Sequence, residues 1–325
     1  MIAPALYVAP LEGLTGWNFR LLHHRLFPGA NRYYTPFLSP IEGTGLTPRA
    51  LREVLPSNNQ DIPLVPQLLT NRPDCFLDAA FLLAGMGYRE VNLNLGCPSG
   101  TVVSKGKASG MLNDPDAVDR LLDGIFEKCP IAVSVKTRIG RFDADEWEPL
   151  MEVYNRYPIT ELTIHPRIRM QMYRGKPNME AFAYALSSAR MPICYNGDIF
   201  SPEDASDLLS AFPGVSALMV GRGLIANPGL IREIRGMPRV DAPTLRAFHD
   251  AILAETEERL SGSTHVLHRM KELWFYLIQL FEDADRHAKR IRKSLHMSEY
   301  RSAVDRLFDE CTIGAHTAFC PPSEP

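Results

Sequence analysis

The segment EVNLNLGCP (90–98) shows the pattern that decides the fold. Its first six residues alternate polar and apolar side chains, which is typical of a short strand, and Gly96 and Pro98 end that strand. An amphipathic stretch precedes it at 75–87 and another follows it at 116–129. Because strands that alternate with helices build parallel sheets, the segment predicts a β-α unit.

The same unit recurs along the first 240 residues. Eight strands are predicted at 6–10, 32–38, 63–69, 90–95, 131–137, 161–166, 191–197 and 216–221. Eight β-α units in about 230 residues match the usual size of a TIM barrel, the (β/α)8 fold. A doubly wound sheet is the alternative, but no G-x-G-x-x-G follows the first strand. We therefore predict an α/β TIM barrel over residues 1–240.

The pattern changes near residue 240. Residues 241–310 contain long helical patterns with no strand between them, so we expect a C-terminal all-helical domain. The last residues, 311–325, have the composition of a flexible tail.

Composition limits the function only weakly. A net charge of -3 in 325 residues neither indicates nor excludes a nucleic-acid partner, so local patches must decide. The six cysteines lack C-x-x-C spacing, which argues against a disulfide framework and against a metal site. We expect reduced thiols and a cytoplasmic location. The first residues predict a strand rather than a signal peptide, and no apolar run reaches the length of a membrane span.

Polar residues or glycines stand at the ends of six predicted strands. In a barrel these ends meet at one mouth, where active sites lie. A single lysine or histidine there is more often structural, but the same feature at six strand ends favours a functional site. The residues are Gln67, Asn92, Asn94, Lys136, His165, Asn196, Gly197, Asp198, Gly221 and Arg222.

The last two strands are followed by NGD (196–198) and GRG (221–223). Barrels commonly hold a phosphate on these two loops. Glycines let backbone N–H groups approach phosphate oxygens, and Arg222 can add a charged fork. The sequence therefore predicts a phosphorylated cofactor or substrate, and Lys136 could face the electron-rich part of a ring system.

Cys97 directly follows a strand and could be core filler, a nucleophile, a metal ligand or an acid. No Cys or His partner lies at ligand spacing, which disfavours a metal. A thiol with an ordinary pKa of about 8.5 is mostly protonated at neutral pH and can act as an acid. An inert buried thiol is the structural alternative.

A basic run lies at 286–296. Arg286, Lys289, Arg290 and Lys293 share one face at helical spacing. Such a stripe can follow a phosphate backbone, although most charge runs are only solvated faces. Lys105, in the loop after Cys97, could position RNA near the mouth.

Seven segments in order resemble the motif set of the tRNA-dihydrouridine synthases, in the form of the bacterial FMN barrel. They are APLEGLTGWNFR (9–20), PQLL (66–69), VNLNLGCP (91–98), VSVKTRIG (133–140), IHPRIRMQMYRGKP (164–177), NGDI (196–199) and VGRG (220–223). The resemblance covers the barrel, and the helical domain fits the family's RNA-binding domain. It implies an FMN enzyme, active as a monomer, that reduces the C5–C6 double bond of uridine in tRNA with NADPH.

The resemblance also implies roles for individual residues. In these roles Cys97 gives a proton to C5 after hydride reaches C6 of the uracil, and Asn94 and Arg167 face that base. From the charge pattern rather than from the resemblance, Lys105, Lys289, Arg290 and Lys293 are expected to contact the tRNA. The residues implied for FMN are Pro10, Leu11 and Glu12 under the ring, Gln67, Lys136 and His165 beside it, and Asn196, Gly197, Asp198, Gly221 and Arg222 at the phosphate end.

The sequence departs from the family at five places. They are Gly16 for an aspartate, Pro36 for an acidic residue, GKAS (106–109) for G-x-G-S, Ile168 for a threonine and Met179 for a tryptophan. The flavin motifs are intact, so the departures concern RNA or base contacts. Three alternatives stay open: a small-molecule FMN barrel of the dihydroorotate or dihydropyrimidine dehydrogenase type, a non-enzymatic RNA-binding barrel, and a ribosomal RNA substrate.

Overall fold

The computed structural model describes residues 4–315 and 319–320. Nine strands in this part of the chain form one sheet in the order β3-β2-β1-β9-β8-β7-β6-β5-β4. Every paired register is parallel. The strands are β1 (Ala5–Val8), β2 (Arg32–Tyr34), β3 (Leu64–Val65), β4 (Gln67–Leu68), β5 (Glu90–Leu95), β6 (Ala132–Gly140), β7 (Leu162–Ile168), β8 (Ile193–Asn196) and β9 (Ala217–Val220).

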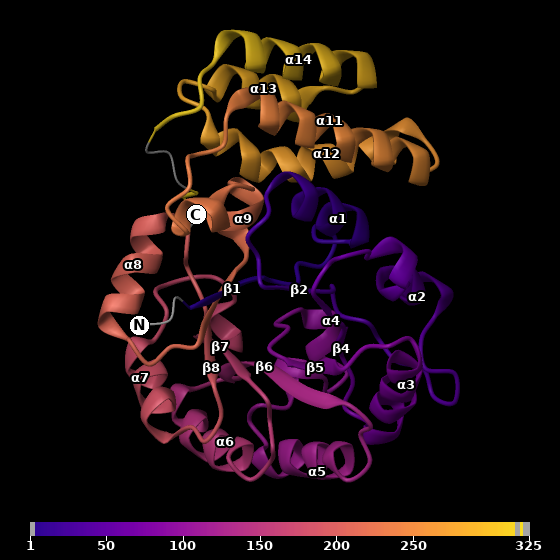
Figure 1. The fold of residues 1–325 in the computed structure, drawn as a ribbon, viewed down its shortest axis with the longest axis vertical. Coiled ribbons are helices and arrows are strands. Elements are labelled where there is room, and N and C mark those ends of the chain that lie inside the picture. The colour runs from indigo at the N-terminus through magenta and orange to yellow at the C-terminus, as the bar shows by residue number, and fades with distance from the viewer. Residues whose placement is uncertain (1–3, 316–318, 321–325) are drawn as a thin grey trace. The chain divides into compact units, whose positions relative to one another are not determined.

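The sheet closes at Pro66. β3 and β4 are the two halves of the strand predicted at 63–69, and Pro66, which has no N–H to donate, separates them. β3 pairs with β2, whereas β4 pairs with β5. Residues 64–68 therefore join the two ends of the sheet and close it into a barrel (Figure 1). This confirms the predicted TIM barrel and its eight strand positions.

The chain divides into two compact units. The barrel unit contains the described residues of 1–17, 31–197 and 208–219, and the helical unit contains those of 18–30, 198–207 and 220–325. The predicted functional boundaries at residues 240 and 310 stay predictions. No helix in the described part of the chain is long and apolar enough to cross a membrane.

Apart from the short α4, the helices of the barrel unit lie around the outside of the strands (Figure 1). They form where caps and apolar spacing agree. In α5, Asp114 caps the helix by accepting from the Ala117 N–H at 3.0 Å, and the buried side chains recur at helical spacing. The helices are α2 (Pro48–Val54), α3 (Pro73–Gly85), α4 (Gly100–Val103), α5 (Pro115–Phe126), α6 (Trp147–Tyr154) and α7 (Met179–Ser188), and α8 (Pro202–Ala211) is divided between the units.

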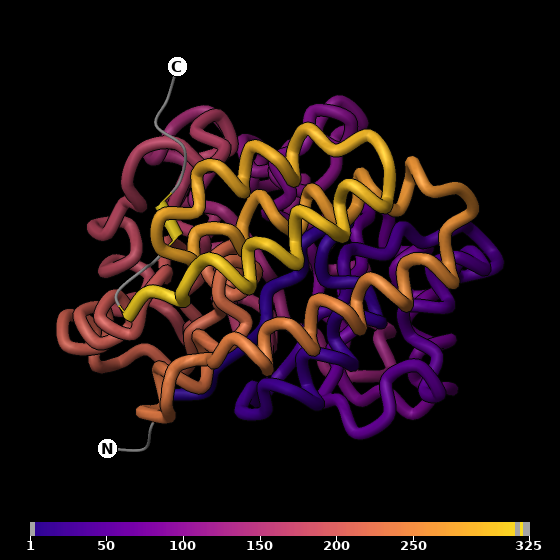
Figure 2. The backbone as a smooth tube through the Cα atoms, turned by 90° about the horizontal axis from the view of Figure 1, so that it is seen from above, coloured from indigo at the N-terminus to yellow at the C-terminus, as the bar shows by residue number. Residues whose placement is uncertain are grey.

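In the helical unit, α13 and α14 pack against each other (Figure 2). No strand occurs among its described residues from 241 to 310, as the sequence predicts. The helices of this unit are α1 (Trp17–Leu26), α9 (Arg222–Ala226), α10 (Leu230–Ile234), α11 (Ala242–Arg259), α12 (Ser263–Leu277), α13 (Asp285–Lys293) and α14 (Met297–Glu310), and η5 (Ile278–Leu280) is a short 3-10 helix.

One predicted helical run is interrupted. The sequence suggests a continuous helix over 264–295, but the structure ends α12 at Leu277 and starts α13 at Asp285. The Glu282 N–H donates to the Thr312 carbonyl at 3.0 Å, and Asp283 adopts a left-handed φ of 52°. Contact with residues far along the chain therefore breaks the run. Of the tail predicted at 311–325, residues 316–318 and 321–325 lie outside the described residues.

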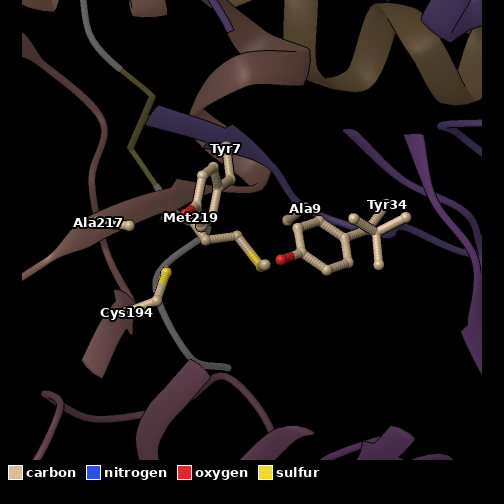
Figure 3. Close-up of a cluster of buried hydrophobic side chains, with 7 residues drawn as sticks. Tyr7, Ala9, Tyr34, Cys194, Ala217 and Met219 are labelled. Carbon is tan, nitrogen blue, oxygen red and sulfur yellow. The ribbon is translucent and has the colours of Figure 1, made fainter. Parts of the chain in front are cut away.

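The core of the barrel unit contains a cluster of side chains from β1, β2, β8 and β9 (Figure 3). Tyr7 and Tyr34 lie with their ring centroids 5.9 Å apart. Cys194 lies in the same cluster and is fully buried, as expected for a structural thiol. The cluster fills the strands' inner surface and gives the sheet a rigid base for the polar residues further along each strand.

Candidate active site

Strand register brings the predicted site residues together. Asn94 on β5 lies opposite Lys136 on β6, and Gln67 on β4 lies opposite Asn92 on β5. Arg138, two residues beyond Lys136, lies opposite His165 on β7. Because alternate residues of a strand point to the same face, these side chains lie on one face of the sheet.

A chain of side-chain amides holds the turn that carries Cys97. Gln67 Nε2 donates to Asn92 Oδ1 at 2.8 Å, and Asn94 Nδ2 donates to Gln67 Oε1 at 2.7 Å. Asn94 Oδ1 accepts from the backbone N–H groups of Gly96 at 3.0 Å and Cys97 at 2.8 Å. Asn94 therefore fixes the place of the thiol, and its predicted contact with the uracil stays a prediction.

Cys97 is half-buried, and its backbone is held on both sides. Its carbonyl accepts from Ser109 Oγ at 2.6 Å, and Arg138 Nε donates to the preceding Gly96 carbonyl at 3.1 Å. Burial raises the pKa of the Cys97 thiol more than the nearby cations Arg138 and Lys136 lower it. The thiol therefore keeps its proton at neutral pH, which suits an acid better than a nucleophile.

The departure at GKAS (106–109) has a structural consequence beside Cys97. Ala108 has a φ of 50°, a left-handed conformation that favours glycine. It is nevertheless fully buried, in a cluster with Leu69 and Val102 against which Cys97 packs. Packing of the alanine methyl group thus offsets a strain of about 1 kcal/mol and closes one apolar wall beside the thiol.

Two cations stand next to the thiol, and no acidic side chain in the described part of the chain pairs with either. Burial lowers the pKa of Lys136 to about 8, with a further contribution from Arg138. Burial lowers the pKa of Arg138 to about 10, and Arg167 adds to the effect. Part of the Lys136 side chain remains accessible to solvent, although its ammonium lies deep among protein atoms. Within the described residues that ammonium has no hydrogen-bond partner.

Arg138 is a site residue that the sequence did not reveal. A single arginine inside a strand leaves no periodic signal, and only its register two residues after Lys136 places it on the same face. Its Nη1 donates to the Ile168 carbonyl at 3.1 Å, and its guanidinium lies 5.4 Å from the ring centroid of Tyr173. Tyr173 was also missed, because it lies in a loop whose shape the sequence does not give.

His165 and Arg167 form a second group on β7. Arg167 Nη1 lies 3.0 Å from His165 Nε2, and Nη2 donates to the Gly175 carbonyl at 2.6 Å. Arg167 Nε also donates to the Arg174 carbonyl at 3.3 Å, and only 1% of the residue is exposed. The structure thus shows Arg167 shaping the loop after β7, and its predicted contact with the uracil is untested.

The loop after β1 carries the three residues predicted under the flavin. Pro10 and Leu11 are half-buried, and Glu12 is exposed. The Leu11 N–H donates to Thr15 Oγ1 at 2.8 Å, which ties the loop into a tight turn. Glu12 contributes to raising the pKa of Cys97, so the loop belongs to the surroundings of the thiol.

The residues predicted at the phosphate end fall in both units. In the barrel unit, Asn196 Nδ2 donates to the Met219 carbonyl at 2.8 Å. A Cβ on Gly197 would collide with the Tyr195 hydroxyl, so packing alone requires this glycine.

In the helical unit, Gly221 directly precedes α9, and Arg222 is its first residue. Arg222 Nη2 lies 2.7 Å from Asp198 Oδ1 in an ion pair whose side chains are both mostly buried. The pair gives the guanidinium a fixed position, as a recognition group for a phosphate needs.

The predicted RNA contacts differ in exposure. Lys105 is exposed, and Asn71 Nδ2 donates to its carbonyl at 3.3 Å. On α13, Lys289 and Lys293 are exposed, whereas Arg290 is half-buried and turned partly toward the protein. The exposed stripe therefore consists of fewer residues than helical spacing alone suggests. Arg292, not assigned to the stripe from the sequence, is also exposed.

A closed parallel barrel with a protonated thiol and two buried cations near its strand ends is a TIM barrel with an enzyme-like site. The sequence pattern of the dihydrouridine synthase (Dus) family matches residues 7–313. The chain belongs to this family, which confirms the family predicted from the sequence.

Relatives of the chain carry the same family name. It is 32% identical over 229 residues to probable tRNA-dihydrouridine synthase 1 of Synechocystis sp., which covers 70% of this chain and 63% of that protein. It is 29% identical to the probable tRNA-dihydrouridine synthase of Staphylococcus epidermidis, covering 69% of this chain and 70% of the relative. The solved structure of a variant of NCR from Zymomonas mobilis shares the fold, with a TM-score of 0.50 and 15% identity over 72% of this chain and 87% of that one.

Proposed function

We propose that this protein reduces uridine in tRNA to 5,6-dihydrouridine, with bound FMN and with NADPH as the electron donor. We also propose that it acts in the cytoplasm as a monomer. The observation that carries the proposal is the arrangement of Cys97, Lys136 and Arg138. A thiol that keeps its proton stands beside two buried cations that no described carboxylate pairs. Family membership and the names of the relatives support the substrate.

The residues present fit FMN. A buried ammonium without a hydrogen-bond partner among the described residues needs an acceptor, and the carbonyl-bearing edge of a flavin ring offers one at Lys136. Gln67 lies on the neighbouring strand beside Asn94, and His165 lies opposite Arg138. Arg222 would hold the phosphate end through charge-assisted hydrogen bonds. When bound, FMN would supply the hydride that C6 of the uracil receives.

Cys97 would supply the proton that C5 then needs. Its raised pKa keeps the proton on sulfur, and Asn94 and Ser109 hold the backbone so that Sγ stays in one place. Arg138 and Lys136 would stabilise negative charge that develops on the uracil. The proton lost from sulfur returns from solvent, since the residue is only half-buried.

The tRNA would be held by phosphate contacts and by contacts to one flipped base. Lys289 and Lys293 are exposed in the α13 stripe, as is Arg286, and Lys105 is exposed in the loop after Cys97. A uracil can meet a flavin at a strand end only if it leaves its stack, so the target is a flipped or loop nucleotide. Asn94 and Arg167 are then proposed to face the base.

The experiment that tests this function uses purified protein and unmodified tRNA transcript. After incubation with FMN and NADPH, nucleoside mass spectrometry should show a uridine product heavier by two hydrogen atoms, mapped to one position. Omitting NADPH is the control, and NADH in its place measures the donor preference. If dihydroorotate-type pyrimidines or ribosomal RNA are converted and tRNA is not, the protein acts on one of the alternative substrates.

A further inference from the structure

Arg222, the proposed phosphate ligand, lies against two neighbouring aromatic rings of the helical unit. Its Cζ is 5.5 Å from the ring centroid of Phe200 and 5.9 Å from that of Phe319. The two rings contact each other edge to face at 5.2 Å. Asp198 Oδ1 accepts from Nη2 in the ion pair described above, and contact with a ring face uses none of the five N–H donors of a guanidinium. The rings and the carboxylate thus contact the guanidinium together and restrict its movement.

Phe319 comes from the part of the helical unit that follows α14, and it is itself anchored. Only 5% of the residue is exposed, and its ring lies 5.4 Å from that of Tyr276 on α12. The N–H of the next residue, Cys320, donates to Gln279 Oε1 at 2.7 Å. The segment at 319–320 is therefore fixed to α12 and η5.

We propose that Phe319 is a positioning residue for the cofactor phosphate, acting through Arg222. The proposal rests on the function proposed above. A long arginine side chain loses rotamer freedom when it grips a phosphate, and a guanidinium already held over two rings has lost that freedom before binding. Cation–π contact keeps it in place without occupying its N–H donors. The C-terminal segment thereby contributes to cofactor affinity although it lies outside the barrel sequence.

The alternative is that Phe319 only covers apolar surface on α12. Under that alternative its loss would affect folding but would not act on FMN through Arg222. A double-mutant cycle separates the two, because it measures whether one residue's effect needs the other.

The experiment measures the FMN affinity of apo-protein by flavin fluorescence titration. Phe319→Leu, which keeps apolar volume and removes the ring, should weaken FMN binding about three- to tenfold. Phe319→Tyr should restore it. In the Arg222→Ala background, Phe319→Leu should cause no further loss. Phe275→Ala is the matched control, since Phe275 is an exposed aromatic residue on α12 at 51% exposure.

An unchanged FMN affinity in Phe319→Leu would overturn the proposal, as would an equal loss with and without Arg222. Phe319→Leu serves as the main variant because Phe319→Ala could unfold the segment. A wild-type protein that binds no FMN would overturn the proposed function itself. Wild-type binding that Phe319→Leu leaves intact would overturn only the role of Phe319.

Discussion

The barrel unit contains two clusters of ionisable residues, and these clusters differ in how their charged groups are paired. Near the strand starts, Arg32 Nη1 pairs with Glu90 Oε1 at 3.0 Å, and the Tyr7 hydroxyl donates to Glu161 Oε2 at 2.9 Å. Further along the strands, Lys136 and Arg138 stand beside Cys97. In the part of the chain that the structure describes, neither of these two cations forms an ion pair.

The difference separates structural charges from functional ones. In the first cluster Arg32 and Glu90 pair with each other and Glu161 accepts from Tyr7, so these contacts can stabilise the barrel. In the second, burial without an acidic partner lowers the pKa of Lys136 to about 8 and that of Arg138 to about 10. Holding such cations costs stability, and no carboxylate among the described residues pairs with either of them. Charges of this kind are expected where a ligand supplies the missing partner.

The largest effect is expected at Cys97. Cys97→Ala should lower dihydrouridine formation by roughly 10²–10⁴-fold, the usual contribution of a positioned acid. FMN binding and its reduction by NADPH should persist, because neither step needs a proton at C5. Single-turnover measurement of the two half-reactions separates them.

Cys129→Ala is the matched control, since Cys129 is also half-buried and burial also raises the pKa of its thiol. It should leave both half-reactions unchanged. Near-normal turnover by Cys97→Ala would show that another group donates the proton, and it would refute the role of the thiol.

A substitution in the first cluster should change the stability of the protein and leave FMN binding unchanged. Tyr7→Phe removes the donor to Glu161 without leaving a cavity, so we expect the free energy of unfolding to fall by about 1.5–3 kcal/mol. FMN affinity should stay at the wild-type value. Urea unfolding and FMN titration of the same preparation test this, and a large loss of FMN affinity would show that the two clusters are not separate.

A smaller effect is expected from the exposed stripe of the helical unit. Lys289→Gln combined with Lys293→Gln should reduce the salt dependence of tRNA binding by roughly two in log–log slope, with FMN content unchanged. Lys128→Gln, at an exposed lysine of the barrel unit, controls for net charge. If the double variant keeps the wild-type slope, the stripe is only a solvated face.

The sequence allowed the prediction of the barrel because each strand leaves a local signal. Short β-rich runs with a turn residue after them mark strands such as 90–95, which the structure reproduces residue for residue. The division of 63–69 at Pro66 was not predicted, although proline cannot donate within a sheet. The break between α12 and α13 could not be predicted, because it depends on a contact with Thr312, thirty residues further on.

The sequence predicted many of the residues of the candidate site, but it did not predict the contacts between them. Cys97, Lys136 and Asn94 stand at strand ends in the sequence, and register places the last two opposite each other. That Asn94 holds the Cys97 turn, and that Arg138 joins the site, follows from hydrogen bonds between segments. Periodicity carries no information about such contacts, because they depend on which strands become neighbours.

The claim that the second cluster serves a ligand at the expense of stability is tested most directly by Lys136→Met. Both the stability and the FMN affinity of this variant are measured. The pKa of Lys136 falls from 10.5 to about 8 on folding, so its charge opposes folding at pH 7. The difference, 10.5 − 8 = 2.5, multiplied by 1.36 kcal/mol gives about 3.4 kcal/mol, and partial exposure reduces the expected value to about 1–3 kcal/mol. Wild-type stability should accordingly rise with pH between about 8 and 10.5, where the unfolded chain binds the extra proton.

Lys136→Met should remove that rise and should be more stable than the wild type at pH 7 by about 1–3 kcal/mol. It should bind FMN roughly 10- to 100-fold more weakly, through loss of a charge-assisted hydrogen bond. Urea unfolding across this pH range, together with FMN titration at pH 7, gives both values. A variant that is less stable than the wild type and binds FMN equally well would contradict the account.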